Sequence, residues 1–278
     1  MVLIIMNYKY IIDIDWENMW RMQAGHILHT GEEAAAFWDK RSQTYEKNIS
    51  QSTYTDELIK RIKLSPDYSV LDVGGGSGLM AIPIAQKVRH VTVLDISNGM
   101  LDLLKNKTES LGISNIDIIN KNWYETDVKS EIKPYDIVLA SRFLPMGDRL
   151  RISLENMTAA AKKYCYATWR TESFDDIEAE SCRLLNKEYS PYPEYPVIYN
   201  CLYQIGIKAD VEIFKSESRM YFQDLKEAVK YFSKNSTIDN ADLNNYESFV
   251  KSLLTEKNDG YYRNSSTKWA LISWKVEK

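Results

Sequence analysis

The sequence is poor in cysteine and has no long apolar run. Its three cysteines, Cys165, Cys182 and Cys201, are scattered through 278 residues and form no CxxC pair, so neither a disulfide framework nor a zinc site is expected. No stretch approaches the ~20 apolar residues of a membrane-spanning helix, and the apolar run 2–6 is too short for a signal peptide. These absences favour a cytoplasmic protein without a bound metal and without a membrane partner.

The sequence also lacks an excess of basic residues. The formal net charge is -4, with 44% hydrophobic and 27% charged residues, a composition typical of a soluble globular protein. A negative balance gives no electrostatic reason to expect a nucleic-acid partner, because binding to the phosphate backbone depends on clustered lysine and arginine.

Glycine, in contrast, is concentrated at one place. Residues 70–78 read Val-Leu-Asp-Val-Gly-Gly-Gly-Ser-Gly, so an apolar run ends on a carboxylate and breaks into four glycines within five positions. The apolar residues of 79–88 follow, which predicts a strand, a glycine turn and a buried helix. Glycines allow positive φ angles and let a ligand approach the backbone closely, so the pattern indicates a nucleotide-type site.

The details of this loop narrow the ligand. A dinucleotide fingerprint requires a third glycine where Leu79 stands, and no Gly-Lys-Ser/Thr of a P-loop follows. Asp72 lies at the lip of the loop, where its charge would repel a pyrophosphate and attract an ammonium group. The start of the next helix can offer free N–H groups to a carboxylate. An amino acid joined to a nucleoside fits both features.

Candidate nucleoside contacts follow on the next two predicted strands. Asp95 ends the run 90–95 and can accept hydrogen bonds from both ribose hydroxyls. Capping of the next helix is the alternative role, although Ser97 is already available as a cap. Asn122 could bind an adenine edge, and Trp123 could stack on the base or equally pack beneath a loop.

The organisation of the chain predicts alternating strands and helices. Apolar, β-branched runs containing Val70, Val91, Ile116, Ile137 and Tyr164 recur through the middle of the sequence with helical segments between them. This rhythm indicates βαβ units and a parallel sheet with helices on both faces. Expected domains are a helical N-terminal cap at 1–52 and a core at 53–278. The core would include a lid insertion at about 170–206, a helical insertion at about 216–262 and late strands at 209–214 and 267–276.

These motifs carry a family resemblance. The run 72–78, Asp95 with the following 96–101, and the predicted fourth strand 135–141 resemble the class I S-adenosylmethionine-dependent methyltransferases, nearest to the small-molecule branch that includes quinone-biosynthesis enzymes. Residues 37–45 are similar to the segment preceding the core in that branch. The resemblance implies a Rossmann-like, doubly wound, seven-stranded sheet, mostly parallel with an antiparallel last strand. It also implies an EC 2.1.1 type transferase that uses S-adenosyl-L-methionine on a small-molecule substrate. A homodimer stays open.

The resemblance also assigns residues to the site. The expected cofactor contacts are Asp72, Gly74, Gly76, Gly78, Asp95, Ile96, Met100, Asn122, Trp123, Ser141 and Tyr45. Gly75 stands where cysteine or another small residue is frequent, and Asn122 stands where aspartate is common. Trp20, Tyr195 and Tyr199 are expected in the substrate pocket. The tyrosines are spaced by four, so they could line a pocket or attract a sulfonium, although a packing stripe is the more frequent meaning.

Methyl transfer is an in-line displacement that requires alignment and exclusion of water, and a general base is optional. His26 and His29 in the N-terminal cap are candidate bases, with a surface or capping role as the alternative. Arg142 follows the fourth strand near substrate or cofactor, where an arginine that pairs with a helix would look the same.

Two other functions stay open on the same sheet. A nicotinamide-dependent oxidoreductase is disfavoured by Asp72 and by the missing third glycine. A cofactor-binding protein without turnover is the second alternative. Residues 141–144 read Ser-Arg-Phe-Leu in place of the Asn-Pro-Pro-Tyr-like tetrapeptide of enzymes that methylate base or amide nitrogens.

Overall fold

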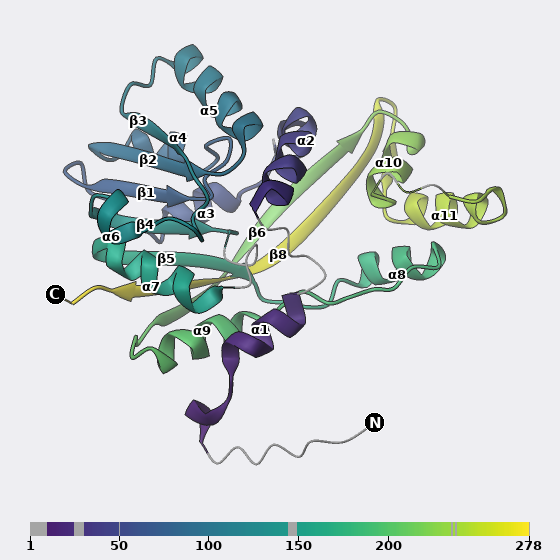
Figure 1. Ribbon diagram of the computed structural model, residues 1–278. Helices are drawn as coiled ribbons and strands as arrows, with labels where there is room; N and C mark the ends of the chain where they lie inside the picture. The colour runs from purple at the N-terminus through teal and green to yellow at the C-terminus, as the bar shows by residue number, and fades with distance from the viewer. Residues whose placement is uncertain are drawn as a thin grey trace.

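The computed structural model describes residues 10–24, 31–49, 51–143, 149–234, 236 and 238–277, with the side chains of 43–49, 240 and 241 left out of the description. Its centre is a sheet whose strands follow the order β3, β2, β1, β4, β5, β8 and β6, with β7 paired to β8 (Figure 1). The strands are β1 (Ser69–Val73), β2 (His90–Asp95), β3 (Ile116–Asn120), β4 (Tyr135–Ser141), β5 (Ala161–Arg170), β6 (Asp210–Phe222), β7 (Thr255–Lys257) and β8 (Gly260–Lys275).

Strands β1 to β5 run parallel, and β8 lies antiparallel to both β5 and β6. Every residue of β1 is buried, because this strand has neighbours on both edges and helices on both faces. The strand order reverses between β1 and β4, the place where an open α/β sheet binds ligands at the carboxyl ends of its strands. The predicted Rossmann-like fold and the antiparallel last strand are confirmed. The described residues form eight strands where seven were predicted, because β7 is a short addition.

Helices cover both faces of the sheet and form two apolar clusters. On one face lie α3 (Tyr54–Ile59), α4 (Ala81–Ala85) and α5 (Asn98–Leu111), which pack on the sheet through residues such as Leu58, Ile84 and Leu104. The other face carries α1 (Trp16–Ala24), α6 (Val128–Glu131), α7 (Leu150–Ala160) and α9 (Tyr195–Gln204). The short 3-10 helix η1 (Ile11–Asp13) precedes α1. Helix α5 begins at an Ser97 cap and ends at Gly112, whose φ is +65°.

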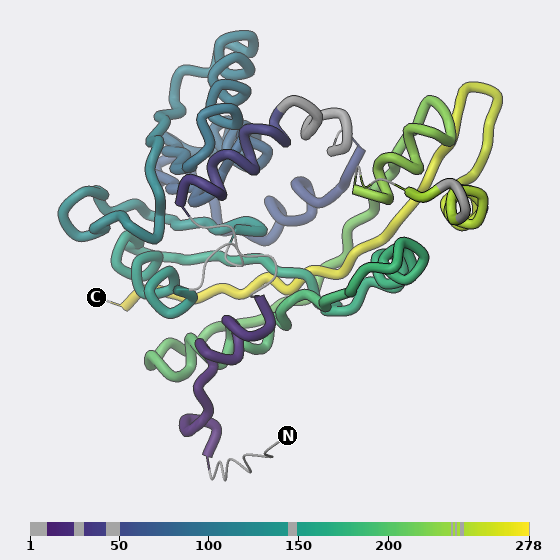
Figure 2. Tube along the Cα trace, turned by 45° about the vertical axis from the view of Figure 1, so that its right-hand side comes forward, coloured from purple at the N-terminus to yellow at the C-terminus, as the bar shows by residue number. Residues whose placement is uncertain are grey.

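Strands β6 and β8 extend beyond the other strands of the sheet, and their outer parts lie next to a separate group of helices. The two strands pair continuously from Asp210 with Ser273 to Phe222 with Tyr261. Near their far end lie α8 (Asp176–Leu184), α10 (Leu225–Phe232) and α11 (Asn240–Ser252), which share a third apolar cluster with Phe222 (Figures 1 and 2). We call the strand segments 217–222 and 261–266 with these three helices the arm.

Both late strands are longer than predicted from the sequence, and most of the additional residues lie in the arm. Residues 215–219 alternate charged and small polar side chains, a pattern without the apolar run that predicts a buried strand. Backbone pairing with β8 nevertheless carries β6 to Phe222. The segment 216–262, expected as a helical insertion, therefore contains strand residues at both ends and β7 as well as helices.

The segments expected as cap and lid each divide between two places. Helix α1 packs against α9 and α7 on one face of the sheet, whereas α2 (Gly31–Ile49) packs against α5 near the glycine loop. Within 170–206, α8 joins the arm and α9 lies against α1 and α7. In the described part of the chain, no helix combines the length and apolar character required to cross a membrane.

Candidate functional site

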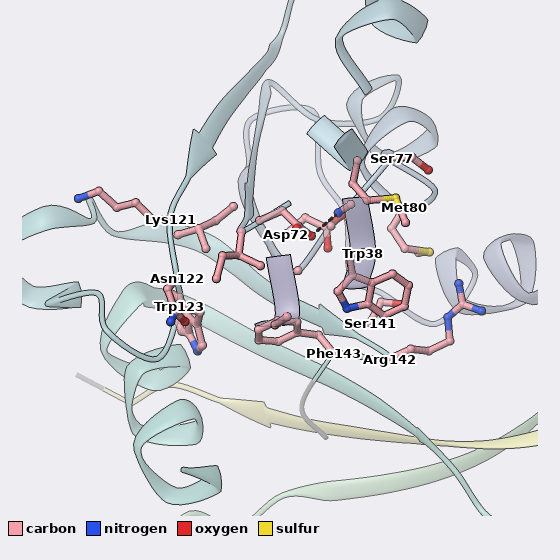
Figure 3. A pocket seen from close by; sticks show the side chains of 18 of the residues that line it. Trp38, Asp72, Ser77, Met80, Lys121, Asn122, Trp123, Ser141, Arg142 and Phe143 are labelled. Atoms are coloured by element: carbon pink, nitrogen blue, oxygen red, sulfur yellow. Dashed lines mark hydrogen bonds between the residues drawn. The ribbon is translucent and has the colours of Figure 1, made fainter. Parts of the chain in front are cut away.

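A pocket of about 300 Å³ opens at the carboxyl ends of β1, β2, β3 and β4, with residues from the first half of α2 in its wall. Figure 3 shows its lining side chains. The volume is at the lower end of the range for small-molecule sites. Predicted residues in its wall are Asp72, Gly74, Gly76, Asp95, Ile96, Met100, Asn122, Trp123, Ser141 and Arg142. The wall also contains residues that the sequence did not single out as contacts: Gly31, Ala34, Trp38, Gly75, Ser77, Leu79, Met80, Leu94, Lys121, Tyr124 and Phe143. Residues from four separate strand ends thus meet at one cavity.

The glycine loop has the backbone that its sequence predicts. Gly74 and Gly76 take φ angles of +67° and +53°. A residue with a Cβ adopts such angles only at a cost in conformational energy. A Cβ at Gly75 would lie 2.7 Å from Oδ2 of Asp72. The loop can therefore fold over the Asp72 carboxyl only because position 75 carries no side chain.

Asp72 is a buried carboxyl without a hydrogen-bond partner. Its residue is 1% exposed, and neither side-chain oxygen has a partner among the described residues. Burial, together with the nearby charge of Asp95, raises the pKa of the Asp72 carboxyl to about 8. An unpartnered buried carboxyl is costly, so a cationic group placed beside it would be stabilised.

Asp95 holds the opposite side of the loop. One carboxylate oxygen accepts a hydrogen bond of 2.9 Å from the Gly76 N–H, and the other accepts one of 2.9 Å from the Ser97 N–H. Burial raises the pKa of the Asp95 carboxyl, while these backbone donors oppose the rise. Asn120 of β3 donates to the carbonyls of Asp95 and Ile96. The end of β2 is thereby fixed from both neighbouring strands.

The two residues after β3 are both in the wall. Asn122 accepts a hydrogen bond of 3.1 Å from the Tyr124 N–H through Oδ1 and borders the cavity. Its amide N–H groups make no hydrogen bond to another described residue, and such donors can bind a ligand. Trp123 is 1% exposed, and its Nε1 donates to Ser153 Oγ at 3.0 Å. The ring therefore packs beneath the loop, and because Trp123 also borders the cavity, stacking on the base stays a prediction.

A buried hydroxyl network fixes the end of β4. The Tyr54 hydroxyl is hydrogen-bonded to Ser141 Oγ at 2.8 Å and to Thr168 Oγ1 at 2.6 Å. Burial raises the pKa of Tyr54, and the charge of Arg142 opposes this shift. The Arg142 N–H donates to Thr168 Oγ1 at 3.0 Å. Residues of α3, β4 and β5 thus fix the backbone position of Arg142 at the end of β4.

Several predicted site residues lie elsewhere. Gly78 is outside the pocket wall, and a Cβ there would lie 2.4 Å from Leu104, so this glycine allows helix α5 to pack closely. Trp20 is fully buried on the other face of the sheet, with its ring 6.2 Å from that of Trp169. Trp20 therefore belongs to the core between α1 and the sheet.

Tyr195 and Tyr199 lie on α9, away from the pocket wall. The apolar stripe of α9 consists of Val197, Ile198, Cys201 and Leu202, and these side chains are the buried ones. The helix buries its aliphatic face, so the tyrosines are left on a less buried side. His26 and His29 fall outside the described residues, as does the side chain of Tyr45.

Helix α2 is the main contribution that the sequence did not assign. Asp39 Oδ1 accepts hydrogen bonds from Ser97 Oγ at 2.6 Å and from the Gly99 N–H at 2.8 Å, which attaches α2 to the start of α5. This places Ala34 and Trp38 in the pocket wall. Their spacing of four residues places them on one helical face, and Trp38 lies within the family-like segment 37–45, so both signals were present in the sequence.

Phe143 and Tyr124 form a second unassigned pair. Their rings stack with centroids 5.7 Å apart, and the Phe143 ring covers Gly74 so closely that a Cβ there would lie 1.9 Å from it. Both rings border the cavity. In the described residues, no group of three or more His, Cys, Asp or Glu side chains is placed to hold a metal ion.

Comparison with known proteins matches residues 70–166 to a family model described as a methyltransferase domain. An uncharacterized protein from Haemophilus influenzae is 29% identical over 247 residues, which are 87% of this chain and 89% of that protein. The (S)-tetrahydroprotoberberine N-methyltransferase of Eschscholzia californica is 24% identical over 63% of this chain, and the match spans 47% of the plant enzyme's length. The crystal structure of the [4+2]-cyclase SpnF superposes with a TM-score of 0.57 at 12% identity, covering 90% of this chain and 98% of the cyclase.

Proposed function

Residues 70–166 match a methyltransferase domain, and the sheet has the antiparallel last strand expected of the class I S-adenosylmethionine-dependent methyltransferases, so we propose that this chain transfers the methyl group of S-adenosyl-L-methionine to a small-molecule acceptor. The proposal depends on one observation, which is that two carboxyl side chains, Asp72 and Asp95, lie beside the same glycine loop. Charge and shape both match a ligand that combines an amino acid with a nucleoside.

The residues present fit this cofactor at four points. Asp72 is an orphaned buried carboxyl in the wall, and the ammonium of the methionine portion would provide its missing partner. Gly74 and Gly76 leave the loop backbone open to close approach. Asp95 lies at the next strand end, where a carboxylate can accept hydrogen bonds from ribose hydroxyls. Asn122 and Trp123 would border the adenine.

When bound, the cofactor supplies a methyl group on a sulfonium, which an acceptor can displace in line. The chain's own residues then need only to bind, orient and exclude water. The glycine loop and Asp72 would fix the amino-acid end, and Asp95 would fix the ribose. Trp38, Phe143 and Tyr124 surround the remaining cavity with aromatic surface. No residue is assigned a proton-transfer role, because the chemistry proceeds without a base when the acceptor is already nucleophilic.

A small-molecule acceptor is supported by the size of the pocket and by the acidic charge balance. The plant relative carries an N-methyltransferase name, which agrees with this class of acceptor. The composition also favours a cytoplasmic location. A cofactor-binding protein without methyl transfer is the second candidate, because the [4+2]-cyclase SpnF shares the fold under the name of a different reaction.

The test is methyl transfer itself. The purified protein would be incubated with S-adenosylmethionine carrying a deuterated methyl group and with a small-molecule extract, and products would be followed by mass spectrometry. We expect one or more small molecules to gain the labelled methyl, and the Asp95→Ala variant to lose this activity. A parallel incubation would contain added RNA, and label found only in that RNA would count against a small-molecule acceptor. Cofactor binding without any transfer would favour the second candidate.

A further inference from the structure

We propose that Arg142 binds an anionic group, a carboxylate or a phosphate, on the methyl acceptor. This inference rests on the proposed function and names the substrate class of that site. It starts from a charge difference within one pocket: Asp72 and Asp95 lie where the cofactor is proposed, and Arg142 borders the cavity beside the end of β4.

The backbone at Arg142 is held in an unfavourable conformation. Its φ of +58° lies in the left-handed region, which a residue with a Cβ adopts only where its surroundings enforce it. The enforcing contacts are the bond from its N–H to Thr168 Oγ1 and the Tyr54 hydroxyl between Thr168 and Ser141. Strained residues of this kind cluster at ligand sites, because the strain directs a side chain.

The guanidinium of Arg142 lies close to two aromatic rings. Its central carbon lies 4.6 Å from the ring centroid of Tyr54 and 5.8 Å from that of Trp269. Trp269 is itself fixed, since its Nε1 donates to Ser216 Oγ at 2.9 Å. A contact between a guanidinium and an aromatic ring uses no oxygen acceptor, so the N–H donors can still bind an anion.

No carboxylate of the described residues neutralises the guanidinium of Arg142. Within the described part of the chain it has no ion-pair partner, whereas Arg61 binds Glu57 and Glu212. The other cation in the pocket wall, Lys121, is paired with Glu131. A cation held in place by rings and strain, but left without an anion, is prepared for one from outside.

The position of Arg142 suits an acceptor approaching from the arm side. Figure 3 shows its side chain directed away from Phe143, with the guanidinium at the edge of the pocket beyond Trp38. Trp269 and Ser216 belong to β8 and β6, close to where these strands continue into the arm. A bidentate contact with a planar carboxylate or a phosphate is the geometry that arginine provides best. Such an anion would also be attracted by the positive sulfonium of the bound cofactor.

The experiment uses the complex with the demethylated cofactor S-adenosylhomocysteine (SAH), titrated by calorimetry with benzoate, phenyl phosphate and the neutral isostere benzamide. We expect the wild type to bind at least one anion roughly tenfold or more tightly than benzamide, and Arg142→Gln to lose this preference, because charge-assisted bonds are removed. The two anions distinguish a carboxylate from a phosphate acceptor. Arg170→Gln is the matched control, since Arg170 also stacks on a tyrosine ring but lies outside the pocket wall with Asp175 3.8 Å away.

Equal binding of benzoate, phenyl phosphate and benzamide by the wild type would overturn the inference, as would an anion preference that survives in Arg142→Gln. Loss of SAH affinity in a folded Arg142→Gln variant would also overturn it, by assigning Arg142 to the cofactor. If Arg142→Gln does not fold, Arg142→Lys decides, with a several-fold weaker preference in support and an unchanged preference against. Failure of the wild type to bind SAH would instead count against the proposed function.

Discussion

The Asp95 carboxylate at the end of β2 accepts a hydrogen bond of 2.9 Å from the backbone N–H of Gly76, in the loop that follows β1. This bond joins the ends of the neighbouring strands β1 and β2, next to the place between β1 and β4 where the sheet order reverses. It also aligns the carboxylate beside the glycine loop before any ligand is present. A ribose hydroxyl would therefore meet an acceptor that is already oriented, which reduces the ordering cost of binding.

Asp72 should release a proton when the cofactor binds. Its pKa of about 8 keeps most of the carboxyl protonated at pH 7 in the free protein. An ammonium beside it favours the ionised form. We expect the calorimetric heat of SAH binding at pH 7 to depend on the ionisation enthalpy of the buffer, and affinity to rise as the pH approaches 8. Asp72→Asn should weaken binding and remove its share of the released proton. Heats independent of the buffer in the wild type would contradict the proposed contact.

The same carboxyl should destabilise the free protein at high pH. An unfolded Asp ionises near pH 4, whereas folded Asp72 holds its proton up to about pH 8. Between these values the native state binds more protons, so stability falls as pH rises through this window. Asp72→Asn should match the wild type near pH 4 and exceed it at pH 8, by at most about 5 kcal/mol. Urea unfolding at both pH values measures this, and an equal difference at both would refute the shift.

Asp39 should support the cofactor pocket without touching the cofactor. Removing its carboxylate in Asp39→Ala eliminates the two bonds that attach α2 to Ser97 and Gly99. Trp38 would then be held less firmly in the wall, and we expect SAH affinity to fall roughly tenfold, equivalent to about 1.4 kcal/mol. Glu33→Ala, an exposed acid on the same helix, serves as the control. Equal affinities in the two variants would show that α2 is not anchored through Asp39.

Tyr54→Phe should destabilise the core next to the site. The change removes a hydroxyl that bonds both Ser141 and Thr168, and leaves buried partners unsatisfied at a cost of about 1 to 3 kcal/mol. Urea denaturation would measure the difference. Tyr203→Phe, on the exposed side of α9, should change stability by less than about 0.5 kcal/mol. A similarly small effect at Tyr54 would mean that the network contributes little.

The local sequence was sufficient to predict those site residues that lie directly at the end of a recognisable strand. Asp72, the glycines and Asp95 are placed by β1 and β2, whose buried apolar runs are read directly from the sequence. The parallel direction of β1 to β5 also follows from βαβ alternation. Gly78 shows that a motif does not give the role of each of its residues. It belongs to the same glycine pattern, but the nearest atom that a side chain at this position would meet belongs to Leu104, so this glycine is explained by packing.

The remainder depends on contacts between segments far apart in the chain. Trp38 reaches the pocket only because α2 is bound to α5 through Asp39, and no local pattern encodes that attachment. Tyr195 and Tyr199 had a suggestive spacing, but the aliphatic stripe of α9 determined which side of the helix became buried. The arm was missed because its strands owe their length to pairing between β6 and β8.

The most direct measurement is a calorimetric titration of the wild type, Asp95→Ala and Asp117→Ala with SAH. Asp117 is an exposed acid on the neighbouring strand β3, 3.0 Å from His90, and serves as the control. We predict saturable one-to-one binding by the wild type and Asp117→Ala, and affinity lowered on the order of 100-fold in Asp95→Ala, because charge-assisted bonds to the ribose are lost. Absence of saturable binding in the wild type, or unchanged affinity in Asp95→Ala, would contradict this assignment of the site.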